Sequence, residues 1–460
     1  MMDLNVVILA AGKGTRMKSK LPKVLQPLAK QSLLAHVLKT SLSLNAAKVI
    51  VVYGHGGEQV KSDIGTGFSA AEVEWVEQSE QLGTGHAVLQ ALPHLNEGSR
   101  TLILYGDVPL ISENTLTRFL NEVSPGDTGV LTVKLPDPTG YGRIVRDHAG
   151  VVREIVEEKD AGNEIRKIVE VNTGIMLADS KDLQQWLPSI DSNNAQGEYY
   201  LTDLVKIANQ HDVPVIGCRV KDPIEVEGVN DKRQLARLER LYQRKLAEEL
   251  MIAGATLADP ARIDIRGQVN ISQDCFIDVN VVFEGQVELG TGVQIGPNCV
   301  IIYSVIGAGS IIKANCVLET AQVGEGCDVG PFARLRPGTE MKRGARIGNF
   351  VETKNTIMEE GAKASHLTYL GDSELGRDVN IGAGTITCNY DGVNKHKTII
   401  GEGAFIGSNS ALVAPVDIGA GATIGAGSTI TKSAKENALT LTRAKQLTIE
   451  SWKRPEKNSQ

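Results

Sequence analysis

The sequence predicts two domains of different fold class, an N-terminal α/β domain and a C-terminal parallel β-helix, joined by one long helix. In residues 1–229, short apolar runs such as 49–53 and 102–105 alternate with helix-like segments, which is typical of a mostly parallel sheet. From residue 263 onward, an aliphatic residue recurs every six positions, a period that fits neither a helix nor an open sheet.

Composition narrows the class of protein. The chain has 460 residues and a net charge of −7, and it shows neither a basic stripe for nucleic acid nor an apolar run long enough to span a membrane. Asp3 stands where a signal peptide would be basic. The six cysteines form no C-x-x-C pair, and four of them share one position of the repeat. We therefore expect buried thiols in a reducing compartment, and a cytoplasmic protein without a nucleic-acid partner or a membrane span.

The first motif, LAAGKGTRM at residues 9–17, directly follows an apolar run. Glycines between a strand and a helix let backbone N–H groups approach phosphate, so an anion site is expected here. GxxxxGK[ST] is absent, and Met17 replaces the third glycine of the dinucleotide fingerprint. Two glycines alone fit an ordinary tight turn equally well. Together with Arg16 and Lys23, however, the loop resembles the triphosphate loop of sugar nucleotidyltransferases.

Residues 231–251 change character. Leucines recur at helical spacing among Arg, Lys and Glu residues, at Leu235, Leu238, Leu241, Leu246 and Leu250. This pattern predicts one amphipathic helix, a linker or an oligomer contact. The expected domains are therefore 1–230, the linker helix 231–251 and 252–460.

The six-residue repeat predicts a β-helix of three short faces, with one aliphatic residue per face pointing inward. It runs through Ile265, Ile271, Ile277, Phe283, Leu289, Ile295 and Ile301, slips by one residue at Ile306 and again at Val323, and continues to Ile430. We expect breaks at 348–374 and 388–399, where polar residues collect, and a basic tail at 439–460. A flat-faced prism has no pocket of its own, so these departures are the first candidates for function.

Five short motifs occur in order before the repeat: LAAGKGTRM, LPK at 21–23, QLGTGHA at 81–87, YGDVP at 105–109 and GEYYLTD at 197–203. With the repeat, they resemble the bacterial bifunctional N-acetylglucosamine-1-phosphate uridylyltransferase / glucosamine-1-phosphate N-acetyltransferase family over essentially the whole chain. The resemblance implies a Rossmann-like nucleotidyltransferase domain, a left-handed β-helix and a homotrimer. It also implies acetylation of glucosamine 1-phosphate by acetyl-CoA, then uridylyl transfer from UTP, which supplies UDP-N-acetylglucosamine for peptidoglycan and lipopolysaccharide precursors.

For uridylyl transfer, the attacking phosphate is already an anion, so cations rather than a base are required. The resemblance assigns this role to Arg16 and Lys23, and assigns Mg²⁺ to Asp107 and Asn230. The other expected contacts of UTP and UDP-N-acetylglucosamine are Leu9, Ala10, Ala11, Gly12, Gln78, Gly83, Thr84, Tyr105 and Gly106, with Gly142, Glu157 and Asn172 on the sugar side.

For acetyl transfer, the substrate amine must lose a proton, a task suited to a neutral histidine. The resemblance assigns it to His366. Arg336, Lys354 and Tyr369 are expected to hold the sugar phosphate, and Asn380 the sugar. Acetyl-CoA is expected at Ala383, Asn389, Tyr390, Ser408, Ala426 and Arg443, with Asn389 also matching a sugar contact.

Two other hypotheses remain open at this point. The β-helix could be a regulatory or oligomerising module beside a single catalytic domain, or it could be only a scaffold. Both predict an unbroken repeat without clustered Arg, Lys and His residues. The polar residues collected around Lys354, His366 and Tyr369 favour two catalytic domains instead.

Overall fold

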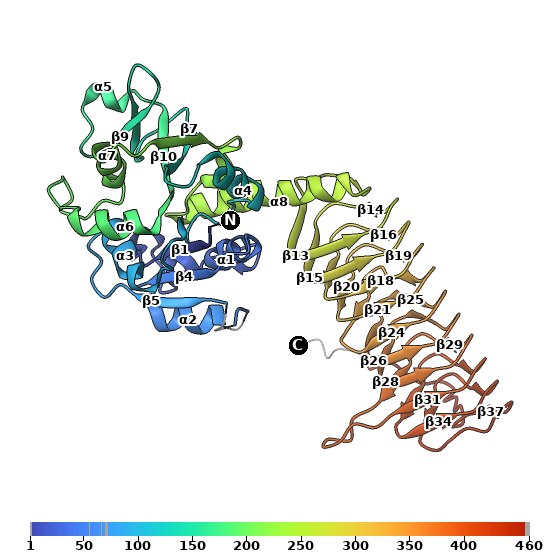
Figure 1. Cartoon of the computed structure of the whole chain (residues 1–460). Coiled ribbons are helices and arrows are strands. Elements are labelled where there is room, and N and C mark those ends of the chain that lie inside the picture. Colours follow the sequence, from blue (N-terminus) through green and yellow to red (C-terminus); the bar gives the residue numbers. More distant parts are fainter. Residues whose placement is uncertain (1, 55, 66, 70–71, 456–460) are drawn as a thin grey trace, which may run out of the picture. The chain divides into compact units, whose positions relative to one another are not determined.

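The computed structural model describes residues 2–54, 56–65, 67–69 and 72–455. The chain divides into two compact units, Met1–Tyr242 and Gln243–Gln460 (Figure 1). The division falls inside helix α8 (Lys232–Ile252), whereas the sequence assigned the whole helix to a linker. Among the described residues, no helix has both the length and the apolar character that crossing a bilayer requires.

The first unit is built on a nine-stranded mixed sheet of order β11-β7-β10-β6-β1-β4-β5, with β8 and β9 attached beside β10. Strand β1 (Leu4–Ala10) pairs in parallel with β4 (Lys48–Tyr53) and β6 (Arg100–Tyr105), while β10 (Glu170–Asp179) runs antiparallel to β6. The remaining strands are β5 (Glu74–Glu77), β7 (Thr128–Lys134), β8 (Arg143–Arg146), β9 (Val152–Val156) and β11 (Val215–Arg219), with the small hairpin β2 (Pro27–Leu28) and β3 (Gln31–Ser32) apart from the sheet.

Helices cover both faces of this sheet (Figure 1). Alternate residues of β1 point to opposite faces. Val6 and Ile8 belong to the core that contains α1 (Leu33–Ser43), and Val7 belongs to the core that contains α3 (Thr84–Ala91). The other helices are α2 (Gly57–Gly65), α4 (Glu113–Glu122), α5 (Asn163–Arg166), α6 (Ser180–Trp186) and α7 (Asp203–Gln210). A central strand buried on both faces explains the uninterrupted apolar run.

The loop after β1 differs from the expectation. The helix expected directly after the glycines is only a short 3₁₀ segment, η1 (Thr15–Met17), followed by a second, η2 (Lys23–Leu25). The first α-helix begins at Leu33, where the Ser32 hydroxyl accepts a hydrogen bond from the Ala35 N–H at 3.2 Å. The loop therefore lacks the helix N-terminus that the sequence suggested, and its cations come from Arg16 and Lys23.

Helix α8 makes specific contacts in each of the two units. In the first unit, Leu238 is buried in a small core with Met17 and Leu28, and the Tyr242 ring lies edge-on to His36 at 5.5 Å between centroids. In the second unit, the buried Gln243 amide donates to the Ile265 carbonyl at 2.8 Å and accepts from the Ile265 N–H at 2.6 Å. The amide thus provides hydrogen-bond partners for the backbone N–H and carbonyl of Ile265, in the first long strand of the repeat.

The second unit is a parallel β-helix of three strand stacks. One stack is an eleven-stranded sheet: β12 (Thr256–Leu257), β14 (Phe276–Ile277), β16 (Gln294–Ile295), β19 (Ile311–Ile312), β22 (Asp328–Val329), β25 (Arg346–Asn349), β27 (Lys363–His366), β29 (Asn380–Ile381), β32 (Phe405–Ile406), β35 (Thr423–Ile424) and β37 (Leu439–Thr440). The fold class expected from the sequence is confirmed, and the stacked parallel strands are consistent with the left-handed form.

The other two stacks form one fifteen-stranded sheet, because long bent strands run through both. The long strands are β13 (Ile263–Ile271), β15 (Val281–Leu289), β26 (Glu352–Met358) and β28 (Tyr369–Leu375). The short ones are β17 (Val300–Ile302), β18 (Val305–Ile306), β20 (Val317–Glu319), β21 (Gln322–Val323), β23 (Arg334–Leu335), β24 (Thr339–Met341), β30 (Ile386–Cys388), β31 (Thr398–Ile400), β33 (Ala411–Val413), β34 (Val416–Ile418) and β36 (Thr429–Ile430).

The expected break at 348–374 was wrong. Strands β25 to β28 continue the stacks there, and the inward positions are held by Thr353, Met358, Ala364 and Leu370, all buried. Thr353 and Ala364 are not large aliphatic residues, so the six-residue spacing cannot be recognised in this part of the sequence. Before the tail, the described chain departs from the strand stacks only between β30 and β31. The tail begins later than expected, because β37 still pairs with β35.

The one-residue slips of the ladder coincide with tight corners. Tyr303 and Thr320 follow the inward residues just before the two slips seen in the sequence, and both have left-handed backbones, with φ of 43° and 47°. Asn355 and Asp372 have φ of 47° and 46° at the equivalent corners of later coils. A left-handed residue turns the chain sharply. It does not shorten the corner by itself, because Gly285 has φ of 69° at the equivalent corner of an earlier coil whose inward residues keep the six-residue spacing.

The four cysteines of the repeat are buried and unpaired, as expected. Three of them donate to a carbonyl of the next coil: Cys275 to Gly290, Cys299 to Lys313 and Cys327 to Lys342, each at 3.1 Å. A thiol at this position therefore packs as a small apolar group while also bonding to the neighbouring coil.

Candidate functional site

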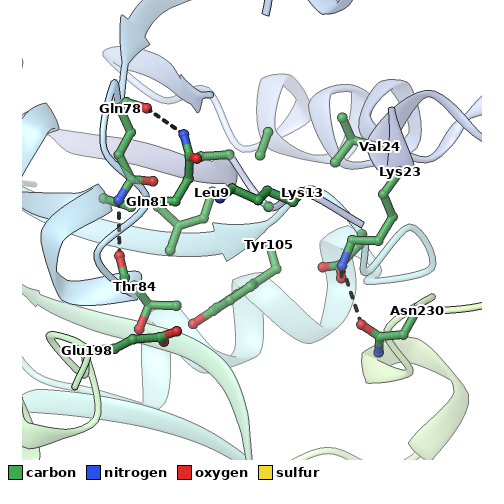
Figure 2. Close-up of a pocket in the computed structure, with 16 residues that line it drawn as sticks. Leu9, Lys13, Lys23, Val24, Gln78, Gln81, Thr84, Tyr105, Glu198 and Asn230 are labelled. Atoms are coloured by element: carbon green, nitrogen blue, oxygen red, sulfur yellow. Dashed lines mark hydrogen bonds and ion pairs between the residues drawn. The ribbon is translucent and has the colours of Figure 1, made fainter. Parts of the chain in front are cut away.

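A cavity of about 530 Å³ opens at the carboxyl ends of β1 and β6 (Figure 2). Many of the residues expected at the nucleotide line it: Leu9, Ala10, Ala11, Gly12, Lys23, Gln78, Gly83, Thr84, Tyr105, Asp107 and Asn230. Ligands of open α/β sheets bind beyond this strand end. The structure thus brings residues from both ends of the first unit's sequence into one pocket.

One end of the pocket is ionic. The Lys23 ammonium pairs with the Asp107 carboxylate and lies 3.4 Å from the Asn230 side-chain oxygen. Arg16 donates to the same Asn230 oxygen at 2.9 Å. The side chains of Lys23 and Asp107 are only 14% and 15% exposed, so solvent screens this pair weakly. Gly14 is required beside them, because a Cβ there would lie 2.7 Å from the Lys23 Cβ.

These groups suit a magnesium ion. A carboxylate oxygen and an amide oxygen face the same cation, the Lys23 ammonium. Mg²⁺ is commonly held by one or two such oxygens together with waters and substrate phosphates. Within the described part of the chain, no three His, Cys, Asp or Glu residues cluster into a cage of protein ligands.

The opposite end of the pocket presents amides and backbone groups. Gln78 is buried, and its Nε2 donates to the Gly83 carbonyl at 3.1 Å and lies 3.0 Å from His86 Nδ1. The Gln81 amide in turn donates to the Gln78 carbonyl at 3.1 Å (Figure 2). These hydrogen bonds fix the orientation of amide and backbone groups to which a planar base could hydrogen-bond.

Tyr105 points into the pocket (Figure 2), whereas three further expected residues, Gly142, Glu157 and Asn172, are not among the residues that line this cavity. A Cβ on Gly142 would lie 3.2 Å from Glu157 Oε1, and the Asn172 N–H donates to the Gly142 carbonyl at 2.8 Å. Burial raises the pKa of Glu157, while the Thr202 hydroxyl opposes that shift. Gly142, Glu157 and Asn172 are therefore neighbours, as a common sugar subsite requires. Gly106, the remaining expected nucleotide contact, packs on Ala10, Val24 and Leu34.

In the second unit, several expected residues meet on successive coils. Arg336 pairs with Glu352 at 2.8 Å, and Glu352 is the strand partner of Tyr369. The Lys395 ammonium, and after it Arg336, lowers the pKa of Lys354. Lys354, Lys395 and Arg336 therefore form a cluster of cations, with the carboxylates of Glu352 and Asp372 beside it.

Tyr369 and Asn389 lie over the same glycine. A Cβ on Gly371 would lie 2.4 Å from the Tyr369 hydroxyl and 2.8 Å from Asn389 Nδ2. The Asn389 amide donates to Asp372 at 2.5 Å. Gly371 therefore leaves the space that these polar groups fill, beside its strand partner Lys354.

The residues expected at acetyl-CoA form a column along one corner. Gly382 lies against Ser408, and Gly407 lies against Ala426, so Ala383, Ser408 and Ala426 follow one another on successive coils. The Arg443 side chain comes within 4 Å of the Cβ positions of the glycines on both sides of Ala426. Tyr390 is separate from this column: it lies on the loop between β30 and β31, exposed, with its hydroxyl bonded to Gly392.

His366 ends β27 and is exposed, and Asn380 begins the next strand of the same stack. The Thr368 hydroxyl bonds to the His366 carbonyl at 2.7 Å and so fixes the backbone. In the part of the chain that the structure describes, no group hydrogen bonds to the imidazole. The ring is thus available to a substrate, a cofactor or another chain.

Comparison with known proteins supports both halves. A model of the MobA-like NTP transferase domain matches residues 6–171, and one of the bacterial transferase hexapeptide matches 268–303 and 397–432. "Bifunctional protein GlmU" of Saccharophagus degradans is 57% identical over 99% of this chain and 100% of its own length, and that of Marinobacter nauticus is 54% identical over the same shares. The chain belongs to the GlmU family. The family resemblance inferred from the motifs is thereby confirmed.

As a member of the GlmU family, the chain is a bifunctional enzyme with a uridylyltransferase role and an acetyltransferase role. Solved structures add only a distant likeness. HddC from Yersinia pseudotuberculosis has a TM-score of 0.40 and 18% identity, covering 53% of this chain and all of its own, which carries no argument about function. The individual site residues remain predictions.

Sequence reasoning missed several groups. Lys13, Val24, Gln81, Ala87 and Glu198 also line the first pocket. The GEYYLTD motif of this GlmU family member holds residues 82–85, the base-side loop, in place. The Tyr199 N–H donates to the Leu82 carbonyl, and the Tyr199 carbonyl accepts from the Gly85 N–H. The Leu201 N–H donates to the Thr84 hydroxyl. Glu198 and Gln81 lay within quoted motifs, so that signal was present in the sequence.

Gly83→Ala is expected to impair the base-side loop. Gly83 has φ of 120°, and a Cβ would lie 2.6 Å from the Tyr199 carbonyl oxygen. Holding a non-glycine residue in this region costs about 1–3 kcal/mol. The KM for UTP should rise by at least ~5-fold, as one kcal/mol of lost binding requires. Gly65→Ala is the control, since its Cβ would meet nothing within 4 Å. An unchanged KM in Gly83→Ala would contradict the assignment of this loop.

Proposed function

We propose that the first unit transfers a uridylyl group from UTP to N-acetylglucosamine 1-phosphate, with Mg²⁺, giving UDP-N-acetylglucosamine and pyrophosphate. The observation that carries this proposal is the pocket itself. An ionic end built from Arg16, Lys23, Asp107 and Asn230 faces a base-side end built around Gln78, across the glycine loop.

In this reaction a phosphate oxygen of the sugar attacks the α-phosphorus of UTP, and the bond to the β-phosphate bridging oxygen breaks. Both reactants are anions, so their repulsion is the main obstacle and no base is needed. Arg16 and Lys23 offset that repulsion. Asp107 and Asn230 would hold Mg²⁺, which when bound would neutralise negative charge on the phosphates.

We propose that the second unit transfers an acetyl group from acetyl-CoA to the amine of glucosamine 1-phosphate. The C–N bond forms, the thioester C–S bond breaks, and the amine proton passes to His366. Arg336 and Lys354 hold the phosphate, with Tyr369, Asn380 and Asn389 at the sugar. Lys395, which sequence reasoning missed, adds a third cation beside Lys354.

The active form is proposed to be a homotrimer. Phe332 and Phe350 stack at 5.3 Å on the outer corner that ends at Leu367, next to His366, and the three side chains are 49%, 58% and 63% exposed. All three have left-handed backbones, which bulky side chains adopt at a cost. These exposed apolar side chains lie next to the proposed base in spite of that cost. This supports the proposal that a second copy of this chain packs against the corner.

Acetylation precedes uridylyl transfer in this proposal, because the first unit is proposed to use the acetylated sugar. The reactions take place in the cytoplasm and supply precursors of peptidoglycan and lipopolysaccharide. The protein is incubated with glucosamine 1-phosphate, acetyl-CoA, UTP and Mg²⁺, and the products are identified by mass. UDP-N-acetylglucosamine, pyrophosphate and free CoA are expected. Failure of acetyl transfer alone would favour a β-helix that is only a module or scaffold.

Mixing two inactive variants tests the shared site. His366→Ala and Arg443→Ala are each expected to acetylate poorly. If His366 and Arg443 of one site come from different chains, refolding the two variants together in equal amounts should restore about a quarter of the sites. Mixed trimers are confirmed by mass, and each variant refolded alone is the control. No recovery beyond the sum of the single variants would refute the shared site.

A further inference from the structure

Arg143 is a buried guanidinium that the proposed reactions do not use. Its side chain is 2% exposed, and it begins β8, directly after Gly142 of the sugar subsite. An arginine is almost never buried without partners. We propose that Arg143 is a positioning residue that holds the sugar subsite in register from behind, an inference that rests on the proposed uridylyl transfer.

Three segments converge on this one side chain. Its Nη2 lies 2.7 Å from Glu158 Oε2 and 3.5 Å from the Arg166 carbonyl, and its Nη1 donates to the Tyr141 carbonyl. The planar guanidinium presents its donors in a fixed fork, so these acceptors are held at set distances from one another. Arg143 therefore ties the turn before β8 to the chain that follows β9.

The tie lies directly behind the two expected sugar contacts. Arg143 is the strand partner of Val156, so residues 157 and 158 leave the pair of strands beside it. Glu157 follows the last residue of β9, and Glu158 lies in the turn that comes next, where the Asp160 N–H donates to the Glu157 carbonyl at 3.0 Å. Glu158 turns to Arg143, while Glu157 turns to Gly142 and accepts a hydrogen bond from the Thr202 hydroxyl at 3.3 Å.

The adjacent carboxylates thereby acquire different environments. The hydrogen bond from Arg143 lowers the pKa of Glu158, and burial raises the pKa of Glu157. With the guanidinium engaged by Glu158, Glu157 stays available to hydrogen-bond donors of a sugar. Arg143 thus acts on the sugar through Gly142 and Glu157 without touching it.

The test compares the KM values for the two substrates of uridylyl transfer. Arg143→Met should raise the KM for N-acetylglucosamine 1-phosphate by ~10-fold to ~10²-fold, the effect of a small misplacement of binding groups. The KM for UTP should change less than ~2-fold, because Arg143 contacts no group at the base end. Arg143→Lys, which keeps the charge but lacks the fork, and Glu158→Gln should each show a smaller rise of the same kind.

Arg146 provides the matched control. It ends the same strand β8 and pairs with Glu170 at 2.7 Å, but it is bonded to none of the sugar-subsite residues. Arg146→Met should leave both KM values unchanged. A KM for UTP close to that of wild type reports that the first unit of each variant is folded.

Each result decides one question. A KM for the sugar phosphate that stays unchanged in Arg143→Lys and Glu158→Gln, or that rises no more than the KM for UTP, would overturn the inference. So would an equal rise in Arg146→Met, which would indicate general loosening of the unit. Wild-type protein that transfers no uridylyl group to this sugar would instead refute the proposed function.

Discussion

Asp107→Ala is expected to abolish uridylyl transfer and leave acetyl transfer intact. The substitution removes the only carboxylate of the proposed magnesium pair and leaves the partly buried Lys23 ammonium without its ionic partner. Loss of one charge-stabilising group in such a site costs on the order of 10²–10³ in rate. Both activities are measured on the same preparation, and circular dichroism with thermal unfolding reports whether the first unit is folded.

Two comparisons sharpen this prediction. Asp107→Asn keeps an oxygen ligand but removes the charge, so its uridylyl transfer should lie between wild type and Asp107→Ala. Chelation of divalent cations should stop uridylyl transfer and spare acetyl transfer, which is proposed to depend on His366 alone for proton removal. Uridylyl transfer that persists in Asp107→Ala or in excess chelator would remove Asp107 and its metal from the mechanism.

His366→Ala is expected to give the converse result, with acetyl transfer reduced by about 10²–10⁴-fold, the usual contribution of a general base. Uridylyl transfer on the same preparation should be unchanged. The imidazole is exposed and makes no hydrogen bond within the described residues, so its removal leaves no buried partner unsatisfied. A stability loss is therefore not expected.

The pH profile separates this role from mere binding. Wild-type acetyl transfer should decline on the acid side, because the reaction needs both an unprotonated general base and an unprotonated substrate amine. His366→Ala and His366→Asn should retain a residual rate that follows the amine alone. A variant that acetylates at the wild-type rate would exclude His366 as the base.

Much of the β-helix could be predicted because every coil requires the same type of residue at the same positions. One inward side chain per face must be apolar and must stack on the next coil, so six-residue spacing locates Ile277, Ile295 and Ile406 without a structure. The prediction failed at Thr353 and Ala364, where a small or polar residue fills the same position. Spacing reveals a ladder only where its members are recognisably aliphatic.

The sites were predictable where chemistry resides in short motifs and not where it depends on distant contacts. Asp107 and Lys23 stood out by type and by motif, and the structure pairs them across the first unit. The clamp from Tyr199 to the Gly83 loop and the tie from Arg143 to Glu158 join segments whose proximity follows only from the folded sheet. No local pattern signals such pairs.

The loop between β30 and β31 leaves the ladder and returns to it in phase. Cys388 before the loop still stacks on Val413, and Thr398 after it pairs with both Ser373 and Val416. The coils above and below therefore close as though the loop were absent. A segment of this kind can be lengthened, shortened or exchanged between relatives without reworking the prism that bears it. Because Tyr390 and Lys395 lie on this loop, grafting it from a relative is expected to change the proposed ligand contacts of the second unit and leave the strand stacks unchanged.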